Sequence, residues 1–281
     1  MHIFNDVVKL QLALDSYRKK NETIAFVPTM GGLHEGHLSL VRLAKQKADK
    51  VVVSIFVNPT QFGENEDFDK YPNTLSNDKS LLIDNEVDVL FNPDAERVYP
   101  DGFATDIKLD STEGILCGAS RPGHFQGVAQ VVKRLFDIVK PDVAIFGQKD
   151  YQQLLIIKQM VKNLSLDIDI KSGDIVRQKS GLAMSTRNQY LSTNEAITAA
   201  NLYKILNELK QGYLNNQQLD LLINQAKKQL EHHFKLDYIE VLDANTLRQI
   251  TDNTHEIAIL SAVFLGPVRL IDNIIFRRKN V

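Results

Sequence analysis

Short apolar runs alternate with amphipathic stretches over the first 176 residues, and this alternation restricts the fold more than any other feature. Residues 23–27 have the pattern of a buried strand that stops at Pro28, residues 38–49 have helical periodicity, and residues 51–57 return to a β-branched run. The alternation recurs downstream, at residues 87–91, 126–139, 142–146 and 151–163. It predicts an α/β fold with a doubly wound, mostly parallel, Rossmann-like sheet.

The pattern changes near residue 176. A polar loop there precedes two long helical stretches, at 194–211 and 219–234, and the chain then has three strand-like runs, at 238–241, 255–265 and 269–276. We therefore expect a Rossmann-like domain over residues 1–176 and a smaller α+β C-terminal domain over residues 177–281.

Composition excludes several classes of protein. The chain has 33 Lys and Arg against 35 Asp and Glu, so its formal net charge of −2 argues against a broad nucleic-acid footprint. Its longest apolar runs are shorter than the ~20 residues of a membrane-spanning helix, and its first residues do not resemble a signal peptide. Cys117 is the sole cysteine, which favours a packing role for it and fits a reducing compartment. We expect a cytoplasmic protein without membrane or nucleic-acid partners.

The loop after the first predicted strand contains His34-Glu35-Gly36-His37 at the start of a helix. In an open parallel sheet this loop lies at the ligand crevice. Backbone N–H groups and the positive end of the helix dipole favour phosphate there, and two imidazoles can stabilise charge on a phosphoryl group. The alternatives are a zinc pair, which would need other spacing and a further ligand, or a plain surface loop.

A second strand-to-helix loop, Gly147-Gln148-Lys149-Asp150, should lie at the same edge of the sheet. Lys149 is either a phosphate contact or a solvated loop lysine. Asp150 suits a helix N-cap, and that role is compatible with binding a ligand.

Several segments follow one another in a recognisable order. The first is Pro28-Thr29-Met30-Gly31-Gly32-Leu33-His34-Glu35-Gly36-His37, and the others are residues 53–62, 121–125, 146–153, 184–188 and 269–273. Together they resemble the pantothenate synthetase (pantoate-β-alanine ligase) family of HIGH-motif nucleotidyltransferases. One H-x-G-H motif alone would be a weak signal, whereas these ordered blocks span nearly the whole chain.

The resemblance implies roles for individual residues. Catalytic roles fall on His34, His37, Lys149 and Arg187, which would stabilise charge at the phosphates of ATP. ATP-binding positions would be Met30, Gly31, Gly32, Leu33, His34, Glu35, Gly36, His37, Gly147, Gln148, Lys149, Asp150, Val176, Met184, Ser185, Thr186 and Arg187. Substrate positions would be Gln61, Gln153, Met30, Asn58, Arg121 and His124. For Arg121 and His124 an anion contact and the bracing of a loop are equally open, and Thr186 stands where the family usually has a second serine.

The implied reaction is the ATP-dependent condensation of pantoate with β-alanine to pantothenate, through a pantoyl-adenylate, with release of AMP and pyrophosphate. Mg²⁺ bound to the phosphates, a homodimer, and a C-terminal lid domain whose loop at Ser185 and Arg187 closes over ATP are implied as well. The acidic positions that contact the metal in the family cannot be matched to Asn77, Asp78 or their neighbours. The rival interpretations are a different nucleotidyltransferase, which leaves a nucleotide in its product, and a non-catalytic nucleotide sensor.

Overall fold

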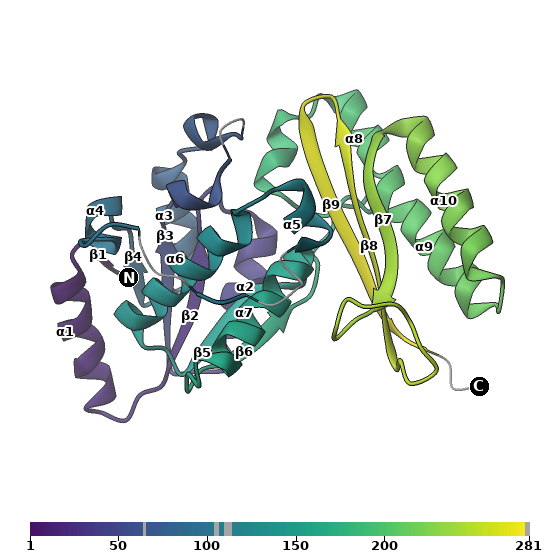
Figure 1. Ribbon diagram of the computed structural model, residues 1–281. Helices are drawn as coiled ribbons and strands as arrows, with labels where there is room; N and C mark the ends of the chain where they lie inside the picture. Colours follow the sequence, from purple (N-terminus) through teal and green to yellow (C-terminus); the bar gives the residue numbers. More distant parts are fainter. Residues whose placement is uncertain (64–65, 104–106, 110–113, 279–281) are drawn as a thin grey trace. The chain divides into compact units, whose positions relative to one another are not determined.

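The computed structural model describes residues 1–63, 66–103, 107–109 and 114–278, and its ribbon is shown in Figure 1. Contacts group the chain into two compact units: residues 1–148 with 152–174, and residues 149–151 with 175–281. In the part of the chain that the structure describes, every helix is too short or too polar to cross a bilayer.

The first unit is built on a parallel sheet. Among the described residues this sheet has six strands, in the order β1-β4-β3-β2-β5-β6, and each pair of neighbours is parallel. The strands are β1 (His2–Phe4), β2 (Ile24–Thr29), β3 (Lys50–Ile55), β4 (Val89–Phe91), β5 (Val143–Gly147) and β6 (Asp169–Gly173). The helices are α1 (Val7–Arg18), α2 (Glu35–Lys45), α3 (Leu75–Asp84), α4 (Ala95–Val98), α5 (Cys117–Ser120), α6 (His124–Val139) and α7 (Tyr151–Asn163).

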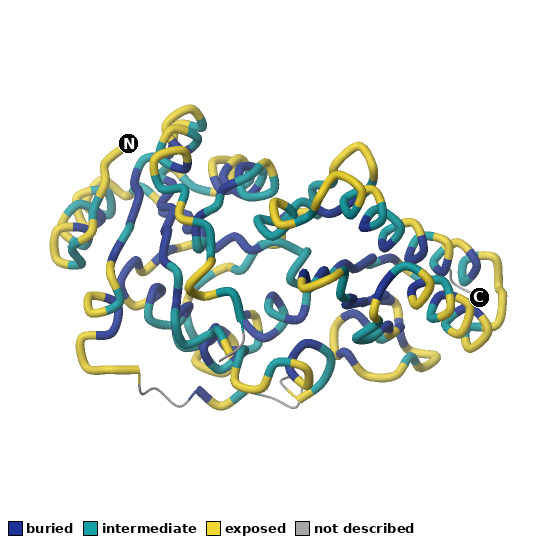
Figure 2. Tube along the Cα trace, turned by 90° about the horizontal axis from the view of Figure 1, so that it is seen from above, coloured by how far each residue is buried: buried dark blue, intermediate teal, exposed yellow. Residues whose placement is uncertain are grey.

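Both faces of this sheet are covered, which explains why its central strands are apolar throughout. Ala25 and Val27 of β2 pack in one cluster with residues of α2 and α3. Phe26, between them, points to the opposite face and contacts Phe136 of α6 with ring centroids 6.4 Å apart. In the burial-coloured tube the central strands β2, β3 and β4 are mostly dark blue, and the outer turns of the helices include yellow segments (Figure 2).

The fold class predicted from the sequence is confirmed, with differences in detail. Pro28 does not end the first strand, since β2 continues to Thr29 and pairs with β3 along its length. Beyond Phe26 the strand no longer pairs with β5, and proline is tolerated where a strand is paired on one side only. The outer strands β1 and β6 and the helix α3 were not predicted.

The second unit has an antiparallel sheet covered by helices. Its described residues form three strands in the order β7-β8-β9, and their apolar side chains share a core with α9 and α10. The elements are α8 (Thr193–Ala199), α9 (Asn201–Leu214), α10 (Leu219–His233), β7 (Lys235–Asp243), β8 (Glu256–Leu265) and β9 (Val268–Arg277). The single helix expected over 194–211 is thus interrupted at Ala200, whose φ of −63° and ψ of −22° remain in the helical region.

Because the strands of the first sheet run in one direction, the loops that follow β2, β3, β4 and β5 all leave from the same edge. The loop after β3 forms the short 3-10 turn η1 (Pro59–Gln61), which packs on α6 at Gly127. A Cβ added to Gly127 would lie 2.3 Å from the carbonyl oxygen of Thr60 and 2.8 Å from the nitrogen of Gln61. The contact requires glycine, since both obstacles are backbone atoms.

We predict that Gly127→Ala destabilises the protein, because the added methyl forces η1 away from α6. Overpacking of this kind costs about 1–3 kcal/mol, despite the better helix propensity of alanine. Denaturant unfolding measures the loss. Gly114→Ala is the control, since a Cβ there meets nothing within 4 Å; equal effects of the two substitutions would contradict the prediction.

Candidate active site

The loop between β2 and α2 has a backbone that glycine makes possible. Gly31 and Gly32 have φ values of +85° and +63°, in the left-handed region that other residues rarely adopt. A Cβ on Gly31 would also come within 3.1 Å of Asp78 Oδ2 and Ile55 Cγ2. The two glycines therefore let the chain turn closely over the end of β3 and over Asp78 before α2 begins.

Asp78 of α3 stabilises this turn through hydrogen bonds to its backbone. Its Oδ2 accepts the N–H of Gly32 at 3.0 Å, its Oδ1 accepts the N–H of Leu33 at 2.9 Å, and the Thr74 hydroxyl donates to both oxygens at 3.1 Å. The residue is 1% exposed. The donors of Gly32 and Leu33, which the sequence pattern suggests for phosphate, are thus paired with a carboxylate that fixes the shape of the loop.

His34 and His37 lie where α2 begins. His34 is the N-cap residue, and its Nδ1 accepts the N–H of Gly36 at 3.1 Å. Nδ1 of His37 is 3.4 Å from the backbone nitrogen of His34, and the two ring centroids are 4.2 Å apart. The imidazoles are therefore neighbours at the positive end of the helix dipole, where an anion is favoured.

The same contacts indicate which ring nitrogen carries the proton. Because Nδ1 of each neutral imidazole faces a backbone donor, its proton belongs on Nε2. Each Nε2–H can then donate to an anionic oxygen. Half-burial of both side chains keeps them within reach of a ligand.

The loop after β3 places Gln61 beside the first loop. Gln61 Nε2 lies 2.7 Å from Sδ of Met30, and Gln61 Oε1 lies 3.4 Å from Nδ2 of Asn58. Met30 and Gln61 are partly exposed, whereas Asn58 is 1% exposed. The structure thus brings together three of the predicted substrate positions, and Arg121 and His124 adjoin them through the Gln61 backbone.

Asn58 is held by the protein itself. Its Nδ2 donates to the carbonyl of Gly127 at 3.2 Å, and its Oδ1 accepts from the hydroxyls of Tyr99 and Thr60 at 3.0 and 3.1 Å. Burial raises the pKa of Tyr99 to about 12, so this hydroxyl remains a donor at any working pH. Asn58 therefore anchors η1 and sets the position of Gln61.

Arg121 and His124 form a second support for Gln61. Arg121 makes a two-bond ion pair with Glu66, each N···O distance being 2.5 Å, and its Nη1 is 2.8 Å from His124 Nε2. Arginine can only donate, so His124 Nε2 accepts and Nδ1–H donates to the Gln61 carbonyl, 2.7 Å away. These contacts brace the loop that carries Gln61.

The pKa of Glu66 is lowered, although burial alone would raise it, because the hydrogen bonds and charge of Arg121 outweigh burial. Glu66 belongs to the acidic stretch Gly63-Glu64-Asn65-Glu66-Asp67. Glu64 and Asn65 of that stretch lie outside the described residues, whereas Glu66 is in the ion pair.

The loop after β5 divides between the two units. Gly147 and Gln148 belong to the first unit, and Lys149 and Asp150 to the second. Lys149 Nζ is 3.7 Å from Asp150 Oδ1. In α7, Gln153 is half-buried, while its neighbour Gln152 turns inward, accepting from the N–H of Cys117 and donating to the carbonyl of Ile115.

The predicted phosphate loop of the second unit is a hairpin followed by a 3-10 turn. The backbones of Arg177 and Ala183 form an isolated antiparallel β-bridge. The carbonyl of Val176 accepts the N–H of Met184 at 2.9 Å. Ser185 then caps η5 (Thr186–Tyr190), since its hydroxyl accepts the N–H of Arg187 at 3.3 Å. The loop is thus ordered by its own contacts around Ser185 and Arg187.

Comparison with known proteins decides the family. Residues 2–275 match the family model described as pantoate-beta-alanine ligase. The pantothenate synthetase of Vesicomyosocius okutanii is 62% identical over 273 residues, which are 97% of this chain and 96% of that protein. The chain belongs to the pantoate-β-alanine ligase family. The family resemblance and the enzyme class predicted from the sequence are confirmed.

Solved structures agree with this pantoate-β-alanine ligase fold. The pantothenate synthetase of Thermus thermophilus superposes with a TM-score of 0.92 at 39% identity, covering 98% of this chain and 99% of that one. The pantoate-beta-alanine ligase of Francisella tularensis, solved with beta-gamma ATP and beta-alanine, has a TM-score of 0.81 at 39% identity, with coverage of 98% and 97%.

Sequence reasoning about this ligase missed the structural role of Asp78. A signal was present, because Asp78 lies three residues after Leu75 and four before Leu82, on the apolar face of α3. A carboxylate at such a position must find buried donors, and here they are the N–H groups of the glycine loop. Tyr99 and Glu66 gave no comparable signal, since their partners are distant in sequence.

We predict that Asp78→Asn lowers the stability of the protein by about 1–3 kcal/mol. The amide nitrogen would face a backbone N–H that the carboxylate now accepts. Denaturant unfolding measures the change. Asp84→Asn, at the exposed end of the same helix, is the control; a loss no larger than this control would show that the carboxylate does not hold the loop.

We predict that the stabilising effect of Glu66 depends on pH. Because its folded pKa is below the ordinary 4.5, the stabilisation is present above that value and is lost as pH falls through the lower folded value. The unfolding free energies of wild type and Glu66→Gln should therefore converge below pH 4.5. In an Arg121→Gln background Glu66 should no longer stabilise the protein above pH 4.5, and persistence of this stabilisation would contradict its origin in Arg121.

Proposed function

We propose that this chain condenses pantoate with β-alanine, using ATP, in two steps. A carboxylate oxygen of pantoate attacks the α-phosphorus of ATP, the bond to the bridging oxygen breaks, and pyrophosphate leaves. The amine of β-alanine then attacks the acyl carbon of pantoyl-adenylate, AMP leaves with the electron pair, and the nitrogen loses a proton to solvent. The observation that carries this proposal is the family match over residues 2–275, together with the paired imidazoles at the start of α2.

The histidines stabilise charge in the first step. His34 and His37 present protonated Nε2 atoms at a helix N-terminus, so they can donate to oxygens that gain charge as pyrophosphate leaves. The backbone bonds to Nδ1 fix both rings before ATP arrives. This preorganisation supports roles for His34 and His37 as electrostatic stabilisers rather than general bases.

Pantoate, the acid to be activated, is proposed to bind next to the loop between β2 and α2. Gln61 carries an amide that both donates and accepts, which suits the hydroxyl and carboxylate of pantoate, and Gln153 is assigned the same task. Met30 forms a wall of the pocket beside Gln61. We assign positioning to Asn58, Arg121 and His124, since their side chains bond to η1 and the loop after it.

The remaining ATP contacts are proposed from the motif pattern. The first loop, Met30 to His37, and Gly147 and Gln148 would bind ATP from the first unit. We propose that residues 1–176, which also include residues 149–151 and 175–176 of the second unit, form the nucleotide- and pantoate-binding domain. Lys149, Asp150, Val176 and Met184 to Arg187 would bind ATP as well, Lys149 and Arg187 through phosphate. Residues 177–281 would then act as a lid domain.

Magnesium is proposed to enter with ATP. Among the described residues no three His, Cys, Asp or Glu side chains form a metal-binding group, and both oxygens of Asp78 accept hydrogen bonds from the protein. Mg²⁺ commonly binds through substrate phosphates and would neutralise their charge. We further propose a cytoplasmic location. We also propose that the protein is a homodimer, and sedimentation tests this oligomeric state.

We predict that the purified protein, given ATP, magnesium and pantoate without β-alanine, exchanges labelled pyrophosphate into ATP. His37→Ala should reduce this exchange about 10²–10³-fold, as expected for loss of one preorganised donor. His232→Ala, on the exposed end of α10, is the control and should leave the rate unchanged. Active condensation without exchange would exclude a reversible adenylate step, and a near-normal rate in His37→Ala would exclude His37 from it.

A further inference from the structure

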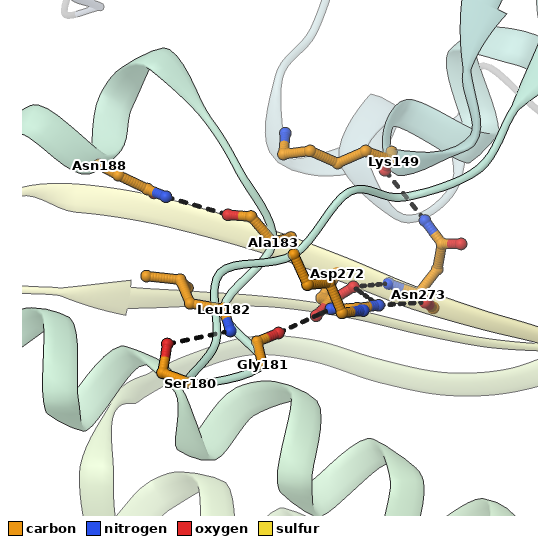
Figure 3. A network of polar contacts seen from close by, with 9 residues as sticks. Lys149, Ser180, Gly181, Leu182, Ala183, Asn188, Asp272 and Asn273 are labelled. Atoms are coloured by element: carbon orange, nitrogen blue, oxygen red, sulfur yellow. Dashed lines mark hydrogen bonds and ion pairs between the residues drawn. The ribbon is translucent and has the colours of Figure 1, made fainter. Parts of the chain in front are cut away.

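The second unit contains a polar network centred on neighbouring residues of β9, Asp272 and Asn273 (Figure 3). Asp272 is 3% exposed and forms a two-bond ion pair with Arg177, at 2.6 and 2.9 Å. Asn273 is 2% exposed and donates from Nδ2 to the main-chain oxygen of Lys149 at 2.9 Å. The loop at Lys149 and the hairpin that contains Arg177 are far apart from β9 in sequence, and both bond to this pair of residues.

Arg177 transmits this anchoring to the hairpin before Ser185. It donates to the carbonyl of Gly181 at 3.2 Å, which closes the hairpin turn, and its guanidinium lies 3.7 Å from the ring centroid of Tyr203. The Arg177 side chain is 17% exposed. A buried carboxylate opposite a stacked guanidinium leaves the hairpin little freedom, because separating the pair would bury an unpaired charge.

Asn273 contacts the loop at Lys149 through a main-chain oxygen of that loop. Its side-chain amide is buried, so loss of the bond to Lys149 would leave a carbonyl and an amide donor without this partner. Adjacent residues of a strand point to opposite faces, so one dipeptide can hold segments that approach β9 from different sides. Residues 149–151 group with the second unit, and the hydroxyl of Tyr151 also donates to the carbonyl of Ala244 at 2.9 Å.

We propose that Asp272 and Asn273 are positioning residues for phosphate binding, which set Lys149 and the hairpin leading to Arg187 on one rigid strand. The inference rests on the proposed function, in which Lys149 and Arg187 contact the phosphates of ATP. It assigns a task to Asp272 and Asn273 of the C-terminal segment 269–273, which the proposed reaction otherwise leaves without one. Lys149 and the hairpin then keep a fixed position relative to one another.

The test is a double-mutant cycle on pyrophosphate exchange, with exchange by the wild type established first, since its absence would refute the proposed function instead. Asn273→Ala should impair exchange about ten- to a hundred-fold through kcat or the KM for ATP, in the range expected for a misplaced catalytic group. The KM for pantoate should stay within about twofold, because Gln61 and its supports lie outside the network. In a Lys149→Ala background, Asn273→Ala should add no further loss.

The matched control is Asp237→Asn. Asp237 of β7 forms a two-bond ion pair with Arg269, at 3.1 and 2.7 Å, and Arg269 lies on β9 like Asn273. The substitution should lower the melting temperature and leave the kinetic constants for ATP unchanged. If Asn273→Ala does not fold, Asn273→Ser serves in its place, since its hydroxyl is too short to keep the bond.

Equal kinetic effects of Asn273→Ala and Asp237→Asn would overturn the proposal, because general destabilisation would then explain both. The proposal would also be overturned if Asn273→Ala reduced pyrophosphate exchange by the same factor in the wild-type and Lys149→Ala backgrounds. A parallel rise in the KM for pantoate and for ATP would have the same meaning, since the effect would not be confined to phosphate.

Discussion

The common direction of the strands in the first sheet is the constraint on which the rest of that unit depends. The carboxyl ends of β2, β3 and β5 meet at one edge because these strands are parallel neighbours. A loop rich in glycine, a turn carrying an amide and a loop leading to a lysine consequently start close together. The direction of the strands alone therefore brings the loops of the candidate site together, whatever side chains they carry.

Many polar groups near the site are already satisfied by the protein. Asp78 accepts the loop donors, Asn58 is bonded on both sides, and Arg121 is paired with Glu66. Groups fixed in this way need little reorganisation when a charged ligand arrives, which is the basis of electrostatic preorganisation. The arrangement separates side chains that hold the loops from those that we propose contact the ligand, such as His34, His37 and Gln61.

Much of this arrangement could be predicted from sequence, and the failures have physical causes. Central strands are buried on both faces, so β2, β3 and β5 appear as apolar runs. The outer strand β6, with the sequence Asp169-Ile170-Lys171-Ser172-Gly173, gives no such signal. The histidine pair was predicted as a unit because its members are close in sequence. The bond from Asn273 to Lys149 spans 124 residues and ends on a main-chain oxygen, so no local pattern announces it.

The assignment of residues 149–151 to the second unit changes how separable the units are. The polypeptide passes from one unit to the other at 148–149, at 151–152 and at 174–175. A cut near residue 175 would therefore leave the C-terminal fragment without the backbone oxygen to which Asn273 donates. The two units are therefore interlaced along the chain, and a continuous segment that begins at residue 175 lacks one hydrogen-bond acceptor of the second unit.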